Sequence, residues 1–312
     1  MKYLFIVNPT AGGHDATDEI RARAEQTFRS RPESYEVYVT RGPRDATRKI
    51  CEEAESGEEL RVYACGGDGT FNECVCGAAL KTNVAVCPFP TGTGNDFCRM
   101  FGRDAARFRD LNAVVNGSIH PIDLISCNGS YSANICSVGI DARIGTDVHK
   151  YTGIPVIGGA GAYVISAVVN AVHGIATEMR IRCGGRSFSG KHTLVCICNG
   201  RFYGGGFNPS TGALLDDGIL DIYIAKKVSL FNFARLIGMY AKGRVDELPQ
   251  YATHMRETEI EIDFDREDVV NLDGEALYTS AVRIRLLPKA MNLILPEGMP
   301  IGSENFPISA SR

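Results

Sequence analysis

The pattern of hydrophobic and polar residues changes partway along the chain. In the first third, short apolar runs predict strands at 4–7, 35–40, 61–65 and 84–89. Helical spacing separates these runs, with apolar residues on one face at Ile20, Ala24 and Phe28, at Ala46, Ile50 and Ala54, and at Phe71, Cys74, Val75 and Ala78. Strands that alternate with helices favour a mostly parallel sheet covered on both faces.

After residue 122 the apolar residues follow a period of two. Asn128-Gly129 and Gly184-Gly185 each separate two apolar runs, which is typical of β-hairpins. Farther along, apolar residues alternate with charged ones at Ile260, Ile262 and Phe264 and again at Val282, Ile284 and Leu286. These segments predict half-buried antiparallel strands. Helical patterns around 160–173 and 229–242 interrupt them, so we expect a β-sandwich with insertions.

Length and composition agree with two domains. The chain has 312 residues, 44% of them hydrophobic, which is enough for two cores. We predict an α/β domain over 1–122, to which the C-terminal tail 290–312 returns, and a β-sandwich domain over 123–289. The net charge is -4 with both signs scattered along the chain, which argues against a nucleic-acid-binding protein.

The cysteines and the N-terminus indicate a cytoplasmic protein. The chain has 11 cysteines, many inside apolar runs, where they behave as small reduced hydrophobes. None forms a CxxC pair, and the N-terminus lacks the long apolar stretch of a signal peptide.

One segment resembles a membrane span in its lack of charge. No Asp, Glu, Lys or Arg occurs over 151–177, but Pro155 and several glycines interrupt the first half. The remainder, 162–172, is shorter than the ~20 residues that a spanning helix needs. We expect either a helix packed on the β-sandwich or a surface helix that makes weak, apolar and reversible membrane contact.

Three glycine-rich segments follow predicted strands. They are Asn8-Pro9-Thr10-Ala11-Gly12-Gly13, Gly66-Gly67-Asp68-Gly69-Thr70 and Pro90-Thr91-Gly92-Thr93-Gly94-Asn95-Asp96-Phe97. Any one could be a tight turn, with Asp68 or Thr70 as a helix cap. However, parallel strands place their ligand crevice at their carboxyl ends, and a helix N-terminus offers N–H groups to phosphate. Three such segments at one edge therefore favour phosphate or nucleotide binding.

These segments also carry a resemblance to a known family. Gly66-Gly67-Asp68-Gly69-Thr70-Phe71-Asn72-Glu73 and Gly92-Thr93-Gly94-Asn95-Asp96-Phe97 resemble motifs of the diacylglycerol kinase catalytic domain, in the type found in soluble bacterial lipid kinases related to sphingosine kinases. The opening Asn8–Gly12 and the late Asn271-Leu272-Asp273-Gly274-Glu275 resemble two further motifs. Cys74-Val75-Cys76-Gly77 departs from the family's usual aliphatic residues and Asn. The first motif alone is shared with NAD kinases.

The resemblance implies a fold and an activity. The fold would be a Rossmann-like, NAD-kinase-like α/β nucleotide-binding domain followed by a β-sandwich domain for the lipid. The activity would be ATP-dependent phosphorylation of a lipid hydroxyl, with diacylglycerol as the first candidate. A sphingoid base, phosphatidylglycerol or a polyprenol would also supply a hydroxyl. A kinase of a soluble substrate, of the NAD kinase type, and a non-catalytic nucleotide sensor remain alternatives.

The resemblance also assigns roles to residues at the glycine-rich segments. Asp68 and Asp96 would hold the catalytic Mg²⁺, directly or through water, and Asp68 would thereby serve catalysis. The nucleotide pocket would comprise Asn8, Thr40, Gly66, Gly67, Asp68, Gly69, Thr70, Asn72, Thr93, Asn95 and Asp96.

Asp273 and Glu275 are candidates for the base that accepts the hydroxyl proton. If the segment is extended, their spacing places both carboxylates on one side. From the residues alone, a hairpin turn at Asp273-Gly274 is the better interpretation. The resemblance favours catalysis, with Glu275 as proton acceptor and Asp273 supporting it.

Two further groups of residues complete the predictions. Asp216-Asp217-Gly218 reads as a turn, where the resemblance implies a structural Mg²⁺ held by Asp217 and the carbonyls of Leu214 and Ile219. Arg99, Arg103 and Arg107 are spaced for one helix face, which we interpret as solvated rather than as a phosphate contact. The expected partners are ATP, a lipid and, transiently, the inner membrane surface, with a homodimer left open.

Overall fold

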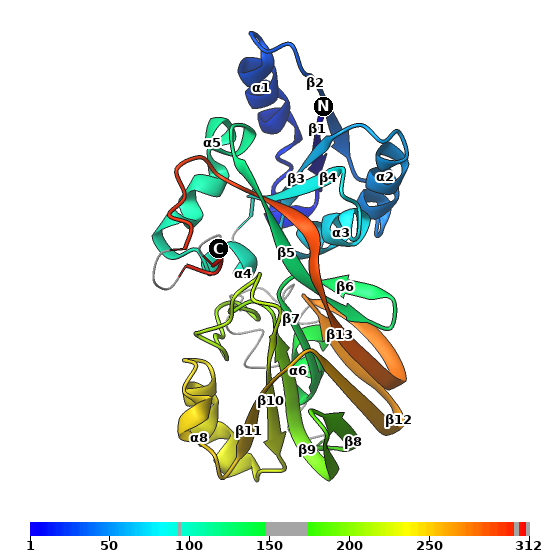
Figure 1. The fold of residues 1–312 in the computed structure, drawn as a ribbon, viewed down its shortest axis with the longest axis vertical. Helices are drawn as coiled ribbons and strands as arrows, with labels where there is room; N and C mark the ends of the chain where they lie inside the picture. The colour runs from blue at the N-terminus through cyan, green and yellow to red at the C-terminus, as the bar shows by residue number, and fades with distance from the viewer. Residues whose placement is uncertain (93–94, 148–173, 303–305, 310–312) are drawn as a thin grey trace. The chain divides into compact units, whose positions relative to one another are not determined.

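The chain folds as two compact units, described here from a computed structural model (Figure 1). The structure describes residues 1–92, 95–147, 174–302 and 306–309. Unit 1 comprises Met1–Leu124, Leu214–Asp217 and Leu287–Arg312, and unit 2 comprises Ile125–Ala213 and Gly218–Leu286. Strands β5 (Ser118–Cys127) and β13 (Glu275–Leu295) each begin in one unit and end in the other.

Unit 1 contains a parallel sheet, as the alternating pattern predicts. Its strands are β1 (Lys2–Val7), β2 (Ser34–Val39), β3 (Leu60–Gly66) and β4 (Val84–Pro90), in the order β4-β3-β1-β2. The end of β13 extends the sheet by pairing in parallel with β4, with Asn292 opposite Ala85. Helix α1 (Thr17–Phe28) covers one face, while α2 (Asp45–Ala54) and α3 (Asp68–Ala78) cover the other (Figure 1).

The predicted apolar faces form the core of unit 1. Ile20, Ala24 and Phe28 of α1 are buried, as are Ala46, Ile50 and Ala54 of α2. The Phe5 ring stacks on Tyr63 with 4.8 Å between ring centroids. Short helical turns complete this unit: η1 (Ala11–Gly13), α4 (Asp96–Arg99), η2 (Gly102–Arg109) and α5 (Leu111–Val115).

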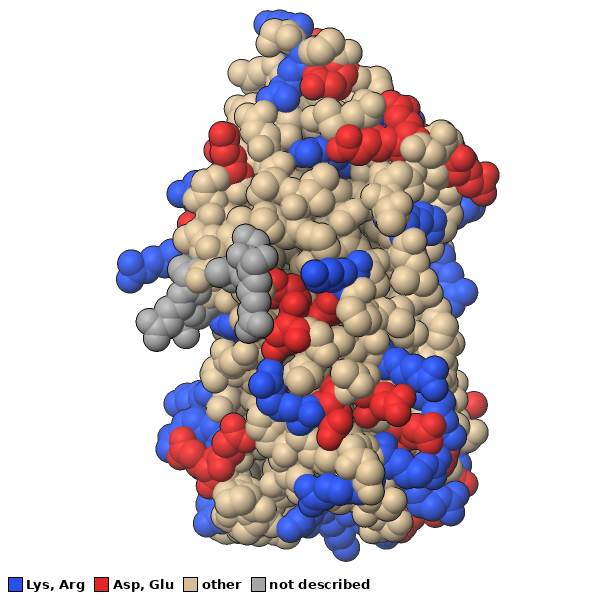
Figure 2. All heavy atoms as spheres, viewed as in Figure 1, with Lys and Arg blue, Asp and Glu red and all other residues tan. Residues whose placement is uncertain are grey.

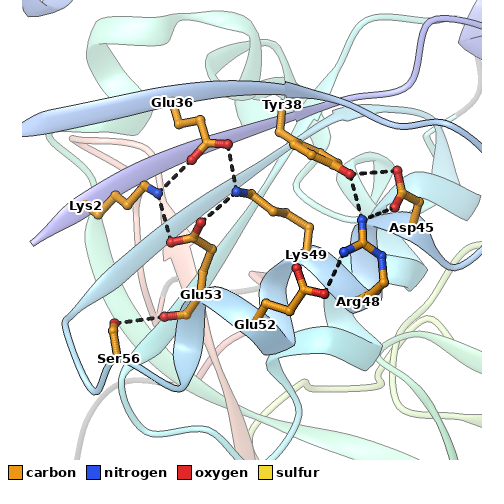
Figure 3. A network of polar contacts seen from close by, with 9 residues as sticks. All are labelled: Lys2, Glu36, Tyr38, Asp45, Arg48, Lys49, Glu52, Glu53 and Ser56. Atoms are coloured by element: carbon orange, nitrogen blue, oxygen red, sulfur yellow. Dashed lines mark hydrogen bonds and ion pairs between the residues drawn. The ribbon is translucent and has the colours of Figure 1, made fainter.

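An ion-pair network joins β1, β2 and α2 (Figure 3). Lys2 Nζ lies 2.7 Å from Glu36 and 2.8 Å from Glu53, and Lys49 Nζ lies 2.7 Å from Glu36 and 2.6 Å from Glu53. Burial disfavours the charged form of all four groups. The hydrogen bonds between them outweigh burial, so the pKa values of both lysines are raised and those of both glutamates are lowered.

Unit 2 is built from antiparallel strands. They are β6 (Ser130–Ser132), β7 (Ile135–Gly139), β8 (Thr177–Cys183), β9 (Arg186–Cys198), β10 (Leu220–Lys226), β11 (Ala252–Glu257) and β12 (Glu259–Leu272), together with parts of β5 and β13. Both predicted hairpins are confirmed, because β5 pairs with β6 around Asn128-Gly129 and β8 pairs with β9 around Gly184-Gly185. The long strands β9 and β12 each pair with β8 over one half and with β7 over the other.

Two apolar clusters lie on opposite faces of the strands of unit 2. Val195 and Ile197 of β9 belong to the first, together with the predicted alternating residues of β12 and β13. Leu194, Cys196 and Cys198 face the second, which is covered by helices α6 (Ile140–Asp147) and α8 (Leu230–Tyr240) and the turn η4 (Val245–Glu247). The α/β class of the first unit and the β-rich class of the second are thus as the sequence predicts.

One predicted helix face is wrong. Arg99, Arg103 and Arg107 do not share a helix, because α4 ends at Arg99 and the 3-10 turn η2 follows. Gly102, with φ +58°, lies at the start of that turn, in a conformation that an α-helix cannot continue through. Arg99 and Arg107 instead each pair with the carboxylate three residues earlier, Asp96 and Asp104.

The question of membrane contact through 162–172 lies outside the described residues, as does the predicted helix over 160–173. Within the described ranges, no helix has the length and apolar character needed to cross a membrane. On the face drawn in Figure 2, acidic and basic side chains are interspersed.

Candidate functional site

Three glycine-containing loops of unit 1 meet at the carboxyl ends of its parallel strands. The loop after β1 touches the loop after β4, since a Cβ built on Gly12 would lie 2.8 Å from the Cα of Gly92. The loop after β3 joins both: Asn8 Nδ2 donates to Thr70 Oγ1 at 3.2 Å, and the Thr91 N–H donates to the Gly66 carbonyl at 3.3 Å. The convergence expected from the strand pattern is therefore present.

The N-terminus of α3 fits a phosphate. Gly67 is the N-cap residue and has no side chain with which to accept the first N–H groups of the helix. A Cβ on Gly66 would lie 2.3 Å from Thr70 Oγ1, so only glycine leaves the backbone this close to the helix start. Gly69 and Thr70 follow in the first turn. An anion bound here would meet the backbone N–H groups of the first turn and the positive end of the helix dipole.

Two predicted metal ligands, Asp68 and Asp96, lie side by side in this region. Asp68 Oδ2 accepts the Asp96 N–H at 3.1 Å, and Asp68 Oδ1 accepts the Phe97 N–H at 3.4 Å. The Asp68 side chain therefore caps α4, while the Asp68 backbone forms the first residue of α3. Two carboxylates beside the N-terminus of α3 are oxygen donors of the kind that Mg²⁺ takes, with water and phosphate oxygens completing its shell. The residues present fit that ion.

The other predicted nucleotide residues lie around the same edge or in the helices behind it. Asn8 Oδ1 accepts the N–H and the hydroxyl of Thr10, which shapes the first loop. Thr40 follows β2 and donates through its hydroxyl to the Val7 carbonyl at the end of β1. Asn72 is buried in α3, and Asn95 precedes α4. Thr93 lies outside the described residues.

Two arginines outside the motifs, and one motif residue to which no role was assigned, make further contacts in this unit. Arg109 Nη2 donates to the Gly92 carbonyl at 3.1 Å, and Arg23 donates to the Arg109 carbonyl. These guanidinium groups bring positive charge to the third loop. Glu73, the last residue of the second motif, accepts the N–H groups of Arg44 and Ala46 at the start of α2. Their sequence separation gives no signal from which these contacts could be found.

Asp273 and Gly274 form the turn of the β12–β13 hairpin in unit 2. Leu272 pairs with Glu275, and both turn residues have positive φ, +51° for Asp273 and +98° for Gly274, as a two-residue primed turn requires. The extended conformation that would place both carboxylates on one side is therefore wrong. The turn interpretation, which the residues alone favoured, describes the backbone.

The hairpin turn gives Asp273 and Glu275 different surroundings. Asp273 accepts the N–H groups of Ile135 at 2.8 Å, Ala133 at 3.0 Å and Asn134 at 3.3 Å, so it ties the turn to the segment between β6 and β7. Burial raises the pKa of Asp273, although the three donors oppose that shift. Glu275 is exposed. Of the two acids, Glu275 is the more exposed, while Asp273 is half-buried and held by its backbone donors.

The predicted structural metal site remains a prediction. Leu214 and Asp217 belong to unit 1 and Ile219 to unit 2, and Asp217 is exposed. The neighbouring Asp216 has a clear role, because its carboxylate accepts the N–H and the hydroxyl of Ser309 at 2.9 and 2.6 Å. Across the described ranges no three His, Cys, Asp or Glu side chains are grouped to hold a metal.

With the fold and these loops in place, comparison with known proteins identifies the class. Residues 2–127 match the diacylglycerol kinase catalytic domain, and residues 134–295 match the YegS C-terminal NAD kinase beta sandwich-like domain. The chain belongs to this family of lipid kinases and is a phosphotransferase.

Individual relatives cover nearly the whole chain. A diacylglycerol kinase from Bacillus subtilis (strain 168) is 30% identical over 275 residues, which is 86% of this chain and 88% of the relative. A "Probable lipid kinase YegS-like" protein from Shewanella frigidimarina (strain NCIMB 400) is 28% identical over 92% of this chain and 93% of its own. The crystal structure of a candidate diacylglycerol kinase from Bacillus anthracis str. Sterne superimposes with a TM-score of 0.73 and 27% identity, covering 95% of this chain and 97% of that one.

Proposed function

We propose that this lipid kinase transfers the γ-phosphoryl group of ATP to the hydroxyl of diacylglycerol, giving phosphatidic acid and ADP. The observation that carries the proposal is the meeting of three glycine-containing loops around Asp68, Asp96 and the start of α3. The lipid acceptor is inferred from relatives named as diacylglycerol kinases.

In the proposed reaction, unit 1 binds the nucleotide. The N–H groups at the start of α3 and the guanidinium of Arg109 offset the charge of the phosphates. Asp68 and Asp96 would hold Mg²⁺, which when bound neutralises charge on the phosphate oxygens. Glycine at 12, 66 and 92 lets the backbone approach the phosphates closely.

Unit 2 supplies the base in this proposal. The Glu275 carboxylate takes the proton of the acceptor hydroxyl as the hydroxyl oxygen forms its bond to the γ-phosphorus. The bond from that phosphorus to the β,γ-bridging oxygen breaks, and ADP leaves with the electron pair. Asp273 acts as a positioning residue, because its three backbone N–H contacts fix the turn that carries Glu275.

The acceptor is tested with a panel. Purified protein is given γ-labelled ATP and Mg²⁺ with diacylglycerol, sphingosine, phosphatidylglycerol or undecaprenol, each in the same detergent micelles, and with NAD in solution. We expect the highest kcat/KM with diacylglycerol. A higher value with another lipid would replace the acceptor and leave the kinase class intact, whereas transfer to NAD alone would overturn the lipid assignment for this chain.

A further inference from the structure

Helix α8 in unit 2 has an outer face of unusual composition. The exposed positions along the helix are Leu230, Phe231, Ala234, Arg235 and Gly238, which form one continuous stripe at helical spacing. Phe231 is 77% exposed and Leu230 is 54% exposed. A helix on the surface of a globular protein normally turns polar residues outward, so a stripe with four apolar members and one arginine needs a partner.

The inner face of the same helix is already packed. Phe233, Ile237 and Tyr240 join the apolar cluster beneath the helix. The Tyr240 hydroxyl lies 2.6 Å from that of Tyr203, which donates to Asp141 at 2.7 Å. Burial raises the pKa of Asp141 to about 6. The inner face of α8 therefore packs on the core of unit 2, and the exposed stripe takes no part in that packing.

The charged residues of α8 and its flanking segments are all basic. Between residues 226 and 244 there are five cations, Lys226, Lys227, Arg235, Lys242 and Arg244, and no acid, in a chain whose net charge is -4. In the described part of the chain, only Arg244 of these five forms an ion pair, with Glu247. The next acid, Asp246, contacts His254 at 2.9 Å. Lys226 donates to the Gln250 carbonyl and Arg235 to the Tyr251 hydroxyl, and both partners are neutral. The positive charge beside the apolar stripe is thus not neutralised and can meet an anionic surface.

We propose that α8 docks this protein on an anionic phospholipid bilayer. The docking surface consists of the stripe Leu230, Phe231, Ala234, Arg235 and Gly238 with the flanking Lys226, Lys227 and Lys242. The two apolar side chains enter the boundary between headgroups and acyl chains, and the cations meet lipid phosphates, which is how amphipathic helices bind membranes in their plane. Charge complementarity selects a bilayer, because a second copy would bring the same four cations, none of them paired with an acid among the described residues, to the interface.

The proposal rests on the proposed lipid substrate only in that such a substrate resides in a membrane. It adds a membrane contact at α8 to the surface helix over 162–172 that the sequence analysis left open beside a packed one.

Tryptophan fluorescence tests whether the α8 stripe contacts the bilayer. The chain has no tryptophan, so Phe231→Trp creates a single reporter on the stripe. We expect its emission to shift to shorter wavelength with vesicles of equal parts phosphatidylglycerol and phosphatidylcholine, and to stay unchanged with phosphatidylcholine alone. Tyr35→Trp, on β2 of unit 1, is the control and should not respond to either vesicle. An emission that is already short without vesicles and depends on protein concentration would indicate a second copy and overturn the proposal.

Sedimentation with the same vesicles, without ATP, separates the two contributions. Lys226→Gln with Lys227→Gln should weaken binding about 25-fold, since each cation near an anionic surface contributes about fivefold. Leu230→Ser with Phe231→Ser should weaken it at least about tenfold through lost apolar burial. One control is Arg21→Gln on α1 with Arg29→Gln at its C-cap, and the other is Leu80→Ser, which also changes an exposed leucine. Equal losses in controls and test variants would contradict the assignment to α8.

Activity measurements separate this proposal from the proposed function. On short-chain diacylglycerol dispersed in detergent, the α8 variants should match wild-type kcat. On diacylglycerol within anionic vesicles they should lose activity in proportion to binding. If the wild-type protein binds vesicles but phosphorylates no lipid, the proposed function is refuted and the docking proposal stands. If the protein phosphorylates lipid but never sediments with vesicles, the docking proposal is refuted and the proposed function stands.

Discussion

Two acidic turns, one in each unit, look alike in sequence but hold their carboxylates differently. Asp68 in unit 1 lies between glycines after a parallel strand and accepts two backbone N–H groups, at 3.1 and 3.4 Å. Asp273 in unit 2 precedes a glycine in a hairpin and accepts three, the shortest at 2.8 Å. Both residues are half-buried, but the first carboxylate adjoins a second acid, Asp96, and the N-terminus of α3, whereas the second adjoins three backbone donors of one segment.

From this difference we expect one acid of the family motifs to serve the scaffold and another to serve the reaction. Three N–H donors occupy most of the acceptor sites of the Asp273 carboxylate and fix its position. Asp68 combines capping of α4 with a position beside the expected phosphates. We therefore expect substitution at Asp68 to act on transfer, substitution at Asp273 to act first on stability, and substitution at Glu275 to act on transfer alone.

The largest effect is expected for Glu275→Gln. Amide substitution removes the proton acceptor and keeps the shape, so kcat should fall about 10²–10⁴-fold. ATP affinity and melting temperature should stay at wild-type values, because Glu275 is exposed on the hairpin. The control Glu267→Gln removes another exposed acid of the same strand pair and should leave kcat unchanged. A Glu275 variant with half of wild-type activity would refute the assignment.

Next in size is Asp68→Asn. The amide retains an oxygen that can accept an N–H from α4 but loses the charge, so Mg²⁺-dependent transfer should fall about 10²–10³-fold with the fold retained. Asp110→Asn is the matched control, since Asp110 caps α5 through the N–H groups of Asn112 and Ala113. Initial rates over a Mg²⁺ titration measure both. Similar small losses in the two variants would mean that Asp68 is only a cap.

Asp273→Asn should reverse the order of effects. Its amide nitrogen cannot accept an N–H, so the free energy of unfolding should fall by about 1–3 kcal/mol in urea titrations. The pKa of Asp273 is raised in the fold, so its contribution is complete below the unfolded pKa of 3.8 and is lost as pH rises through the folded pKa. The variant should lack that part of the pH dependence. An unchanged urea midpoint would show that the three contacts do not stabilise the hairpin.

The smallest effect is expected away from both turns, for Lys49→Met. This change leaves Lys2 to pair with Glu36 and Glu53 and should cost about 1 kcal/mol of unfolding free energy, with ATP binding unchanged. The glutamates, whose pKa values are lowered by folding, contribute stability above the unfolded pKa of 4.5, and this contribution is lost as pH falls through their folded pKa values. The lysines, whose pKa values are raised, contribute stability below the unfolded pKa of 10.5, and this contribution is lost as pH rises through their folded pKa values. The loss should therefore be largest between these values and shrink outside them. A loss that does not vary with pH would indicate packing of the Lys49 stem instead.

The regular elements were predictable because their periods are local. Ile20, Ala24 and Phe28 are three positions on one face, and Asn128-Gly129 specifies its own turn. The meeting of the three loops also followed from sequence, because parallel strands end at one edge. By contrast, the break at Gly102 was missed, since arginines at spacing four fit a helix and a single glycine does not exclude one.

Contacts between distant residues were beyond the sequence. Asp273 meets the N–H of Ile135, and Arg109 meets Gly92, through folding of the whole unit. The same holds for charge: a net value of -4 averages over the chain and conceals the five cations between residues 226 and 244. Only the exposed stripe of α8 shows that these cations flank an apolar surface.

The division of unit 1 into three chain segments has a consequence for the order of synthesis. Asn292 and Leu293 pair with β4, and the carbonyl of Pro307 accepts the N–H of Leu215. On a ribosome, the strands β1 to β4 leave the exit tunnel before residues 292–293 of β13 and Pro307 are synthesised. The edge of β4 that pairs with β13 is therefore unpaired while unit 2 is synthesised. An unpaired edge invites pairing with other chains. A chain of the first 124 residues alone would keep this edge of β4 unpaired. In the full chain, we expect chaperones to bind during translation until the end of β13 pairs with β4.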